Sequence, residues 1–260
     1  MASKTRHNPI VSMLEVVGKY FIFMKQTVVC IFRPPFDGKN IVNQMLEIGY
    51  KSIPVTAITL FFTGMVMALQ IGKAMDSIMS GSSQFIGSAV TIAMFRELCP
   101  VLTGLLLAGR VGSSIAAEIG TMKVTEQIDA LRTLRADPIQ YLSVPRFVAC
   151  LVMVPMLTII TDLLGVLGGA FIAFLSLGIT PEKYLENIVN FVDLNSFLSG
   201  IVKSVFFGII IAIISCYQGF NTEGGAEGVG KATISAVVIS SMTILVSDYF
   251  LTYLLTFIGL

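Results

Sequence analysis

The chain has 260 residues, of which 55% are hydrophobic and 13% are charged, and its formal net charge is +1. Its mean hydropathy is +0.85. A soluble domain is about 25% charged, so this composition excludes an ordinary soluble domain and predicts an integral membrane protein. The near-neutral charge gives no reason to expect a nucleic-acid partner.

Residues suited to metal or nucleophilic chemistry are scarce. The four cysteines, Cys30, Cys99, Cys150 and Cys216, stand singly in apolar runs, so we interpret them as small core residues rather than as disulfides or metal ligands. The single histidine, His7, excludes an HExxH zinc site and argues against a Ser–His hydrolase. We therefore expect neither a metal site nor catalytic residues.

The segment from Ile10 to Phe32 predicts a helix lying in the membrane interface, because its polar and apolar residues fall on opposite faces. The two sets are Glu15, Lys19 and Gln26 on one face, and Leu14, Val17, Phe21 and Val28 on the other. An ordinary membrane span is the alternative. Arg33 to Lys39 (RPPFDGK) cannot continue the helix, so residues 1–40 form a tail and an interfacial helix.

Residues 41–260 predict a five-span, all-α domain. Each span is a long apolar run of the length that crosses a bilayer. The expected spans are Ile53–Ile71, Phe85–Ala108, Phe147–Phe174, Phe197–Tyr217 and Ala232–Ile258. Small residues inside them favour close helix packing in a bundle or a dimer seam; these are Gly104, Gly109, Gly165, Gly168 and Gly169.

Basic residues predict the orientation of the spans. They cluster before the first span and between the second and third, whereas the opposite sides hold only Lys73 and Lys183. The positive-inside rule therefore places the N-terminus and residues 109–146 in the cytoplasm. Residues 73–84, residues 178–196 and the C-terminus face outward.

The cytoplasmic segment 109–146 is too patterned for a slack linker. Val124, Ile128 and Leu131 follow helical spacing, and Asp137 before Pro138 ends the predicted helix. Such a helix suits docking onto a cytoplasmic partner. The alternative, a helix that packs only against its own bundle, stays open on the pattern alone.

The stretch from Arg96 to Arg146, RELCPVLTGLLLAGRVGSSIAAEIGTMKVTEQIDALRTLRADPIQYLSVPR, resembles the signature of the MlaE/YrbE permease family. The family pattern is nearly continuous over this stretch. One departure is Cys99, where a glycine is usual; it adds bulk beside Glu97.

The resemblance implies the membrane subunit of an ABC transporter that moves phospholipid, or sterol in some lineages, and contributes to outer-membrane lipid asymmetry. Its implied partners are a second copy of this chain, a cytoplasmic ATPase that binds ATP and magnesium, a periplasmic MCE-domain protein and, as a further candidate, a small STAS-like protein. Segment 109–146 would hold the coupling helix. The absence of a transit peptide favours a bacterial inner membrane.

Two groups of site residues follow. The coupling candidates are the polar groups of the docking segment: Glu118, Glu126, Gln127 and Asp129. The lipid-cavity candidates are the charged residues of the spans with apolar neighbours as walls: Arg96, Glu97, Lys203, Met67, Leu69 and Leu98.

The cavity hypothesis starts from two charges inside the second span. Charges near mid-membrane cost about 2.5–3.5 kcal/mol each, and side chains at i and i+1 point about 100° apart on a helix, so Arg96 and Glu97 each need another partner. Pro100 also leaves the Arg96 carbonyl without its helical donor. Lys203 is the expected partner. A purely structural ion network is the alternative, and it stays open for Asp162 and Asp248, which we expect to be paired.

Other functions fit less well. An importer of polar solutes also uses a coupling helix, but the cavity here is mostly apolar. An intramembrane enzyme lacks its catalytic groups, and buried charges argue against a plain scaffold. The stretch from Gly225 to Lys231 is almost a phosphate-binding loop, but Ala232 replaces the Ser or Thr that holds magnesium. We interpret it as a flexible turn.

Overall fold

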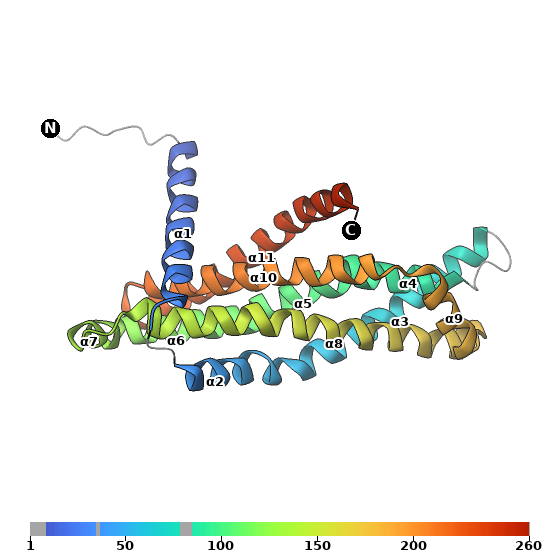
Figure 1. Ribbon diagram of the computed structural model, residues 1–260, viewed down its shortest axis with the longest axis horizontal. Coiled ribbons are helices and arrows are strands. Elements are labelled where there is room, and N and C mark those ends of the chain that lie inside the picture. Colours follow the sequence, from blue (N-terminus) through green and yellow to red (C-terminus); the bar gives the residue numbers. More distant parts are fainter. Residues whose placement is uncertain (1–8, 35–36, 79–84, 260) are drawn as a thin grey trace.

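The computed structural model describes residues 9–34, 37–78 and 85–259, and the regular elements in these ranges are helices (Figure 1). Three predicted features fall partly outside these ranges. They are the N-terminal tail with His7, two residues of the RPPFDGK break, and residues 79–84 of the outer segment.

Five helical stretches are long and apolar enough to cross a membrane, and each coincides with one predicted span, of which only Phe85 lies outside its stretch. They are Gly38–Met75, Ile86–Val124, Ile139–Leu177, Leu194–Phe220 and Gly225–Ile258. The predicted fold class, an all-α membrane protein with five spans, is therefore confirmed. The stretches run 27 to 39 residues, well beyond the ~20 that cross a bilayer.

Several stretches are built from shorter helices joined by tight or wide turns. The first comprises α2 (Gly38–Ile48), the 3-10 turn η1 (Tyr50–Ser52) and α3 (Ile53–Ile78). The second comprises α4 (Ile86–Ala93), the π-helical turn η3 (Met94–Leu98), α5 (Cys99–Leu107), the π-helical turn η4 (Ala108–Gly112) and α6 (Ser113–Val124). The others are η5 (Ile139–Ser143) with α8 (Val144–Leu177), α10 (Leu194–Phe220) and α11 (Gly225–Ile258).

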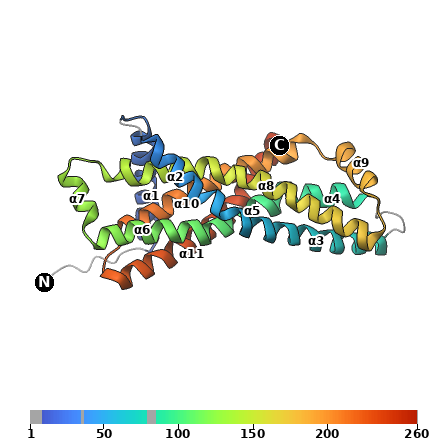
Figure 2. The same ribbon diagram turned by 90° about the horizontal axis from the view of Figure 1, so that it is seen from below.

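Two short helices mark the two ends of the bundle. The helix α7 (Gln127–Thr133) lies at one end, and α9 (Pro181–Phe191) lies at the other, as Figure 2 shows. The sequence did not predict α9. Tyr184 anchors α9 in the core formed with α4 and α8, where its side chain is buried.

Helix α1 (Pro9–Ile31) lies across the long axis of the bundle (Figure 1). Phe23, Thr27 and Cys30 are buried against the bundle, whereas Leu14 and Phe21 are exposed. An exposed apolar face on a helix that crosses the bundle is the geometry expected of an interfacial helix. Helix α1 is also not one of the five spanning stretches.

Glycines bring α3 and α8 into backbone contact. A Cβ atom on Gly64 would collide with the Gly165 backbone, and one on Gly168 would collide with the Phe61 carbonyl. The predicted role of Gly165 and Gly168 in close packing is therefore confirmed. Gly109 makes no such approach within the chain, because a Cβ atom there would meet nothing within 4 Å.

Three boundary predictions were wrong. The helix that contains the second predicted span does not end at Ala108 but continues to Val124. The short helix that follows spans Gln127–Thr133, because Glu126 and Arg135 adopt left-handed backbone angles (φ 60° each) on either side of it. The predicted flexible turn from Gly225 onward is the beginning of α11.

Candidate functional site

The π-helical turn η3 leaves a backbone carbonyl for a side chain to satisfy. Pro100 has no N–H to donate to the Arg96 carbonyl. The Lys203 ammonium donates to that carbonyl oxygen instead, at 2.8 Å. The predicted gap in the helix is therefore real, and a lysine from α10 fills it. The Arg96 side chain itself is half-buried.

Lys203 also joins two carboxylates in an ion cluster. Its Nζ lies 2.8 Å from Glu97 Oε2 and 3.0 Å from Asp248 Oδ1. The Thr252 hydroxyl lies 3.3 Å from Glu97 Oε1 and 2.8 Å from the Asp248 carbonyl oxygen, and it shares its one proton between these two acceptors. The expected proximity of Glu97 and Lys203 is thus present. The sequence did not predict Thr252 as part of the site and did not link Asp248 to Lys203. The available signal was that Asp248 and Thr252 are polar residues four positions apart in α11.

The cluster is sealed on the lysine side and open on the glutamate side. The Lys203 side chain is 1% exposed, whereas that of Glu97 is 43% exposed. Lys203 is the tenth of the 27 residues of α10, which puts it about 14 Å along that helix. A carboxylate on the surface of one chain at this depth would face lipid unless another surface or an aqueous cavity covers it.

The apolar wall candidates are only partly near this cluster. Leu98 belongs to η3, and Met67 packs with it on the core of α3, α4 and α8. Leu69 is half-buried on α3. Helix α3 packs against α8 and α4, whereas Lys203 lies between η3, α10 and α11. A cavity lined by Met67, Leu69 and Leu98 stays a prediction.

Asp162 does not have the partner that we expected. Its side chain is buried in α8, and neither carboxyl oxygen has a hydrogen-bond partner in the described ranges. The helices around it bring hydroxyl and thiol groups rather than a cation: Thr103 and Thr161 hydroxyls lie 3.0 Å apart, and the Cys99 thiol lies 3.5 Å from the Thr161 carbonyl. Cys99 therefore points toward α8 rather than toward the Glu97 carboxylate.

The coupling candidates fall into two places. Glu126, Gln127 and Asp129 lie together at the exposed tip of the bundle, on and before α7. Glu118 lies farther back on α6, where its Oε2 accepts a hydrogen bond from Arg146 Nη2 at 2.7 Å. Arg146 is buried, so Glu118 has an internal partner that the sequence pattern did not reveal.

A bundle of five apolar helices, each able to cross a membrane, with an ion cluster between them, defines a multi-pass membrane protein. Residues 41–254 match the family of the permease MlaE, and the chain belongs to that family.

Two of the similar proteins carry the name of an ABC transporter permease. A probable ABC transporter permease protein of Rickettsia bellii is 45% identical over 244 residues, covering 94% of this chain and 93% of the relative. One from Synechocystis is 41% identical, covering 96% and 94%. The chloroplastic protein TRIGALACTOSYLDIACYLGLYCEROL 1 of Arabidopsis thaliana is 37% identical, covering 88% of this chain and 65% of the relative.

Proposed function

We propose that this chain is the membrane subunit of an ATP-driven phospholipid transporter in a bacterial inner membrane. In this proposal two copies of the chain face each other around a lipid cavity. A separate cytoplasmic ATPase supplies the energy, and a periplasmic MCE-domain protein exchanges lipid with the outer envelope. A STAS-like protein is a candidate accessory partner. The transporter would contribute to outer-membrane lipid asymmetry.

The half-exposed Glu97 carboxylate carries this proposal. A charged group at such a depth is unfavourable against lipid tails, so we infer that a second copy encloses it. The enclosed space would be apolar over most of its wall and charged at Glu97 and Lys203. An acyl chain and a polar headgroup have the complementary pattern.

The nature of the cargo is supported by the name of the Arabidopsis relative, which contains that of a glycerolipid. This favours a lipid over a small polar solute, which would need a hydrophilic passage.

The proposed mechanism is transmitted motion. The tip residues Glu126, Gln127 and Asp129 would contact the ATPase, and closure of the ATPase would push α7 and the long helix that precedes it. Because η3 and η4 interrupt that same helix, its two π-helical turns are places where the displacement can change the helix path. The cavity would then alternate between lipid-accepting and lipid-expelling shapes.

The test compares two substitutions that each leave Lys203 with one carboxylate. Glu97→Gln removes the exposed charge and Asp248→Asn removes the more buried one. Each variant replaces the native chain in cells, and phospholipid in the outer leaflet of the outer membrane is quantified with a membrane-impermeant amine reagent. We expect accumulation with Glu97→Gln and near-native levels with Asp248→Asn.

A purely structural ion cluster predicts otherwise. In that case both variants would lower the melting temperature and both would impair lipid asymmetry in proportion to the lost protein. Equal effects of the two variants, or normal outer-leaflet lipid in Glu97→Gln at normal expression, would overturn the proposed contact between Glu97 and lipid.

A further inference from the structure

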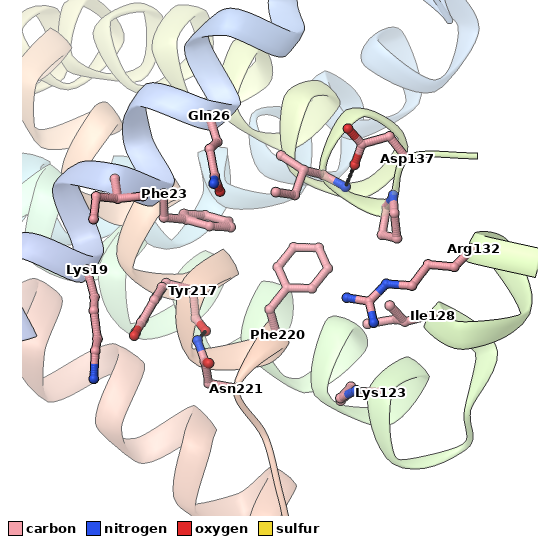
Figure 3. Close-up of a pocket in the computed structure, with 13 residues that line it drawn as sticks. Lys19, Phe23, Gln26, Lys123, Ile128, Arg132, Asp137, Tyr217, Phe220 and Asn221 are labelled. Carbon is pink, nitrogen blue, oxygen red and sulfur yellow. Dashed lines mark hydrogen bonds between the residues drawn. The ribbon is translucent and has the colours of Figure 1, made fainter. Parts of the chain in front are cut away.

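A cavity separate from the Lys203 cluster lies at the end of the bundle that carries α7. It is about 440 Å³ in volume and opens between α1, α7 and the end of α10 (Figure 3). About half of its wall is aromatic or apolar, with Phe23 from α1, Ile128 from α7, and Tyr217 and Phe220 from α10. Aromatic and aliphatic walls of this kind suit the apolar part of an amphiphile.

Cations surround this cavity. Lys19, Lys123 and Arg132 line it, against one carboxylate, that of Asp137. Figure 3 shows the Arg132 guanidinium directed toward Phe220 and the cavity. The Asp137 carboxylate faces the backbone, where its Oδ1 accepts a hydrogen bond from the Ile139 N–H at 3.0 Å. Among the lining residues, three cations face one carboxylate, and the other counter-ions of these cations lie outside the lining. An anionic ligand is favoured where it can displace those counter-ions.

The counter-ions of these cations are exposed and weakly held. Asp129 lies 3.1 Å from Arg132 and 3.8 Å from Lys123, and Glu15 lies 3.0 Å from Lys19. Exposed pairs of this kind contribute about 0.2–1 kcal/mol. A phosphate group makes stronger, bidentate hydrogen bonds with a guanidinium, so it can compete with Asp129 for Arg132.

The position of the cavity indicates which molecule carries that phosphate. Helix α1 lies across the bundle and exposes Leu14 and Phe21, which belong in the acyl region of a membrane. The cationic side chains on its other face then lie at headgroup depth. We propose that this cavity binds the headgroup of an anionic phospholipid from the leaflet on which α1 lies.

A bound headgroup would connect two elements of different roles. Lys19 belongs to α1, whereas Arg132 belongs to α7 and Lys123 to the end of α6. One phosphate held by all three would tie the interfacial helix to the short helix at the tip. The site goes beyond the proposed transport role, because it involves neither Glu97 nor Lys203 and requires no partner protein.

The absence of tryptophan from the sequence allows a direct binding test. Phe220→Trp places a single indole in the cavity wall, and Tyr217→Trp is a second probe if the first variant does not fold. The purified chain in detergent is titrated with dioctanoyl phosphatidylglycerol while indole emission is recorded. We expect a saturable change. Adding Lys123→Ala and Arg132→Ala should raise the half-saturation concentration about tenfold or more.

The matched control is Lys51→Ala with Lys231→Ala, in the same tryptophan background. These lysines are exposed and each pairs with a glutamate one turn away, but neither lines the cavity. We expect no change in half-saturation. Thermal unfolding of every variant confirms that each one is folded.

Four results would overturn the proposal. Titration without saturation, or saturation that the cavity variants do not weaken, would mean that the cavity holds no lipid. Equal half-saturation concentrations for dioctanoyl phosphatidylcholine and dioctanoyl phosphatidylglycerol would show that the cavity does not select an anionic headgroup. The same response to inorganic phosphate would show a free-anion site instead. None of these results bears on the transport proposal, because the probe and variants are remote from Glu97.

Discussion

Lys203 contacts residues of both the second and the fifth spanning stretches. Its ammonium contacts the Arg96 carbonyl, the Glu97 carboxylate and the Asp248 carboxylate at 2.8, 2.8 and 3.0 Å. A buried lysine is tolerated when its charge is paired and its hydrogen-bonding groups are satisfied. Three contacts on one ammonium meet that condition.

Removing this ammonium should be costly. Lys203→Met keeps most of the side-chain volume but leaves two carboxylates and the Arg96 carbonyl without their shared partner. We expect a loss of about 3–5 kcal/mol in the free energy of unfolding, measured by thermal or denaturant unfolding in detergent. Lys231→Met, at an exposed pair with Glu227, should change it by less than about 1 kcal/mol. A similar small effect at Lys203 would refute the assigned role.

Tyr184 gives a pH prediction. Burial raises the pKa of its phenol to about 12, from a usual value of 10.0. Because folding favours the neutral phenol, the stabilising contribution is complete below pH 10 and is lost as pH rises from 10 toward 12. Difference titration of phenolate absorbance between the native chain and Tyr184→Phe should show one group that ionises near pH 12. A difference curve centred near pH 10 would contradict the buried position.

At the scale of elements, the seam between α3 and α8 depends on the absence of side chains. Because the Phe61 carbonyl is backbone, a Cβ atom on Gly168 cannot be accommodated by a rotamer change. The helices must move apart, and the contacts around the seam weaken.

Gly168→Ala should therefore destabilise the chain by about 1–3 kcal/mol. Gly230→Ala is the matched control, since a Cβ atom there meets nothing within 4 Å and alanine favours a helix over glycine by about 1 kcal/mol. Melting temperatures of the two variants should move in opposite directions. Two shifts of the same sign and size would show that the seam is looser than the structure indicates.

The elements that the sequence predicted well are those governed by composition. Five apolar runs were enough to place all five spans, and Pro100 indicated a disturbed helix at Arg96. The ends of the elements were less predictable. Helix continues from Ala108 to Val124 because side chains on α6 pack on α10 and α11, and such tertiary contacts leave no local signal. Helix α9 was missed because Tyr184 packs on α4, far away in sequence.

The same distinction applies to the candidate site. The sequence identified Glu97 and Lys203 because charges in a span need partners. It could not show that Asp248 shares the same ammonium, because that depends on where α11 crosses α10. Among the residues that the structure describes, no cation pairs with Asp162; the polar groups nearby are hydroxyls and the Cys99 thiol, and no local pattern reveals this.

At the scale of the whole molecule, the tip around α7 should be the contact with the ATPase. Asp129→Lys reverses the charge of an exposed tip residue that pairs with Arg132. We expect it to abolish co-purification of the ATPase while the chain still inserts in the membrane, because the substitution reverses a charge at the proposed contact. Glu227→Lys, at an exposed residue in the first turn of α11, should co-purify normally. Unchanged association of the Asp129→Lys chain would exclude the tip as the contact.

The most direct test of the lipid cavity is native mass spectrometry of the purified chain. A cavity between two copies, with Glu97 at its wall, predicts a dimer that retains phospholipid. It also predicts that Glu97→Lys loses this lipid, whereas Glu227→Lys keeps it. A lipid-free monomer, or equal lipid retention by both variants, would contradict the account.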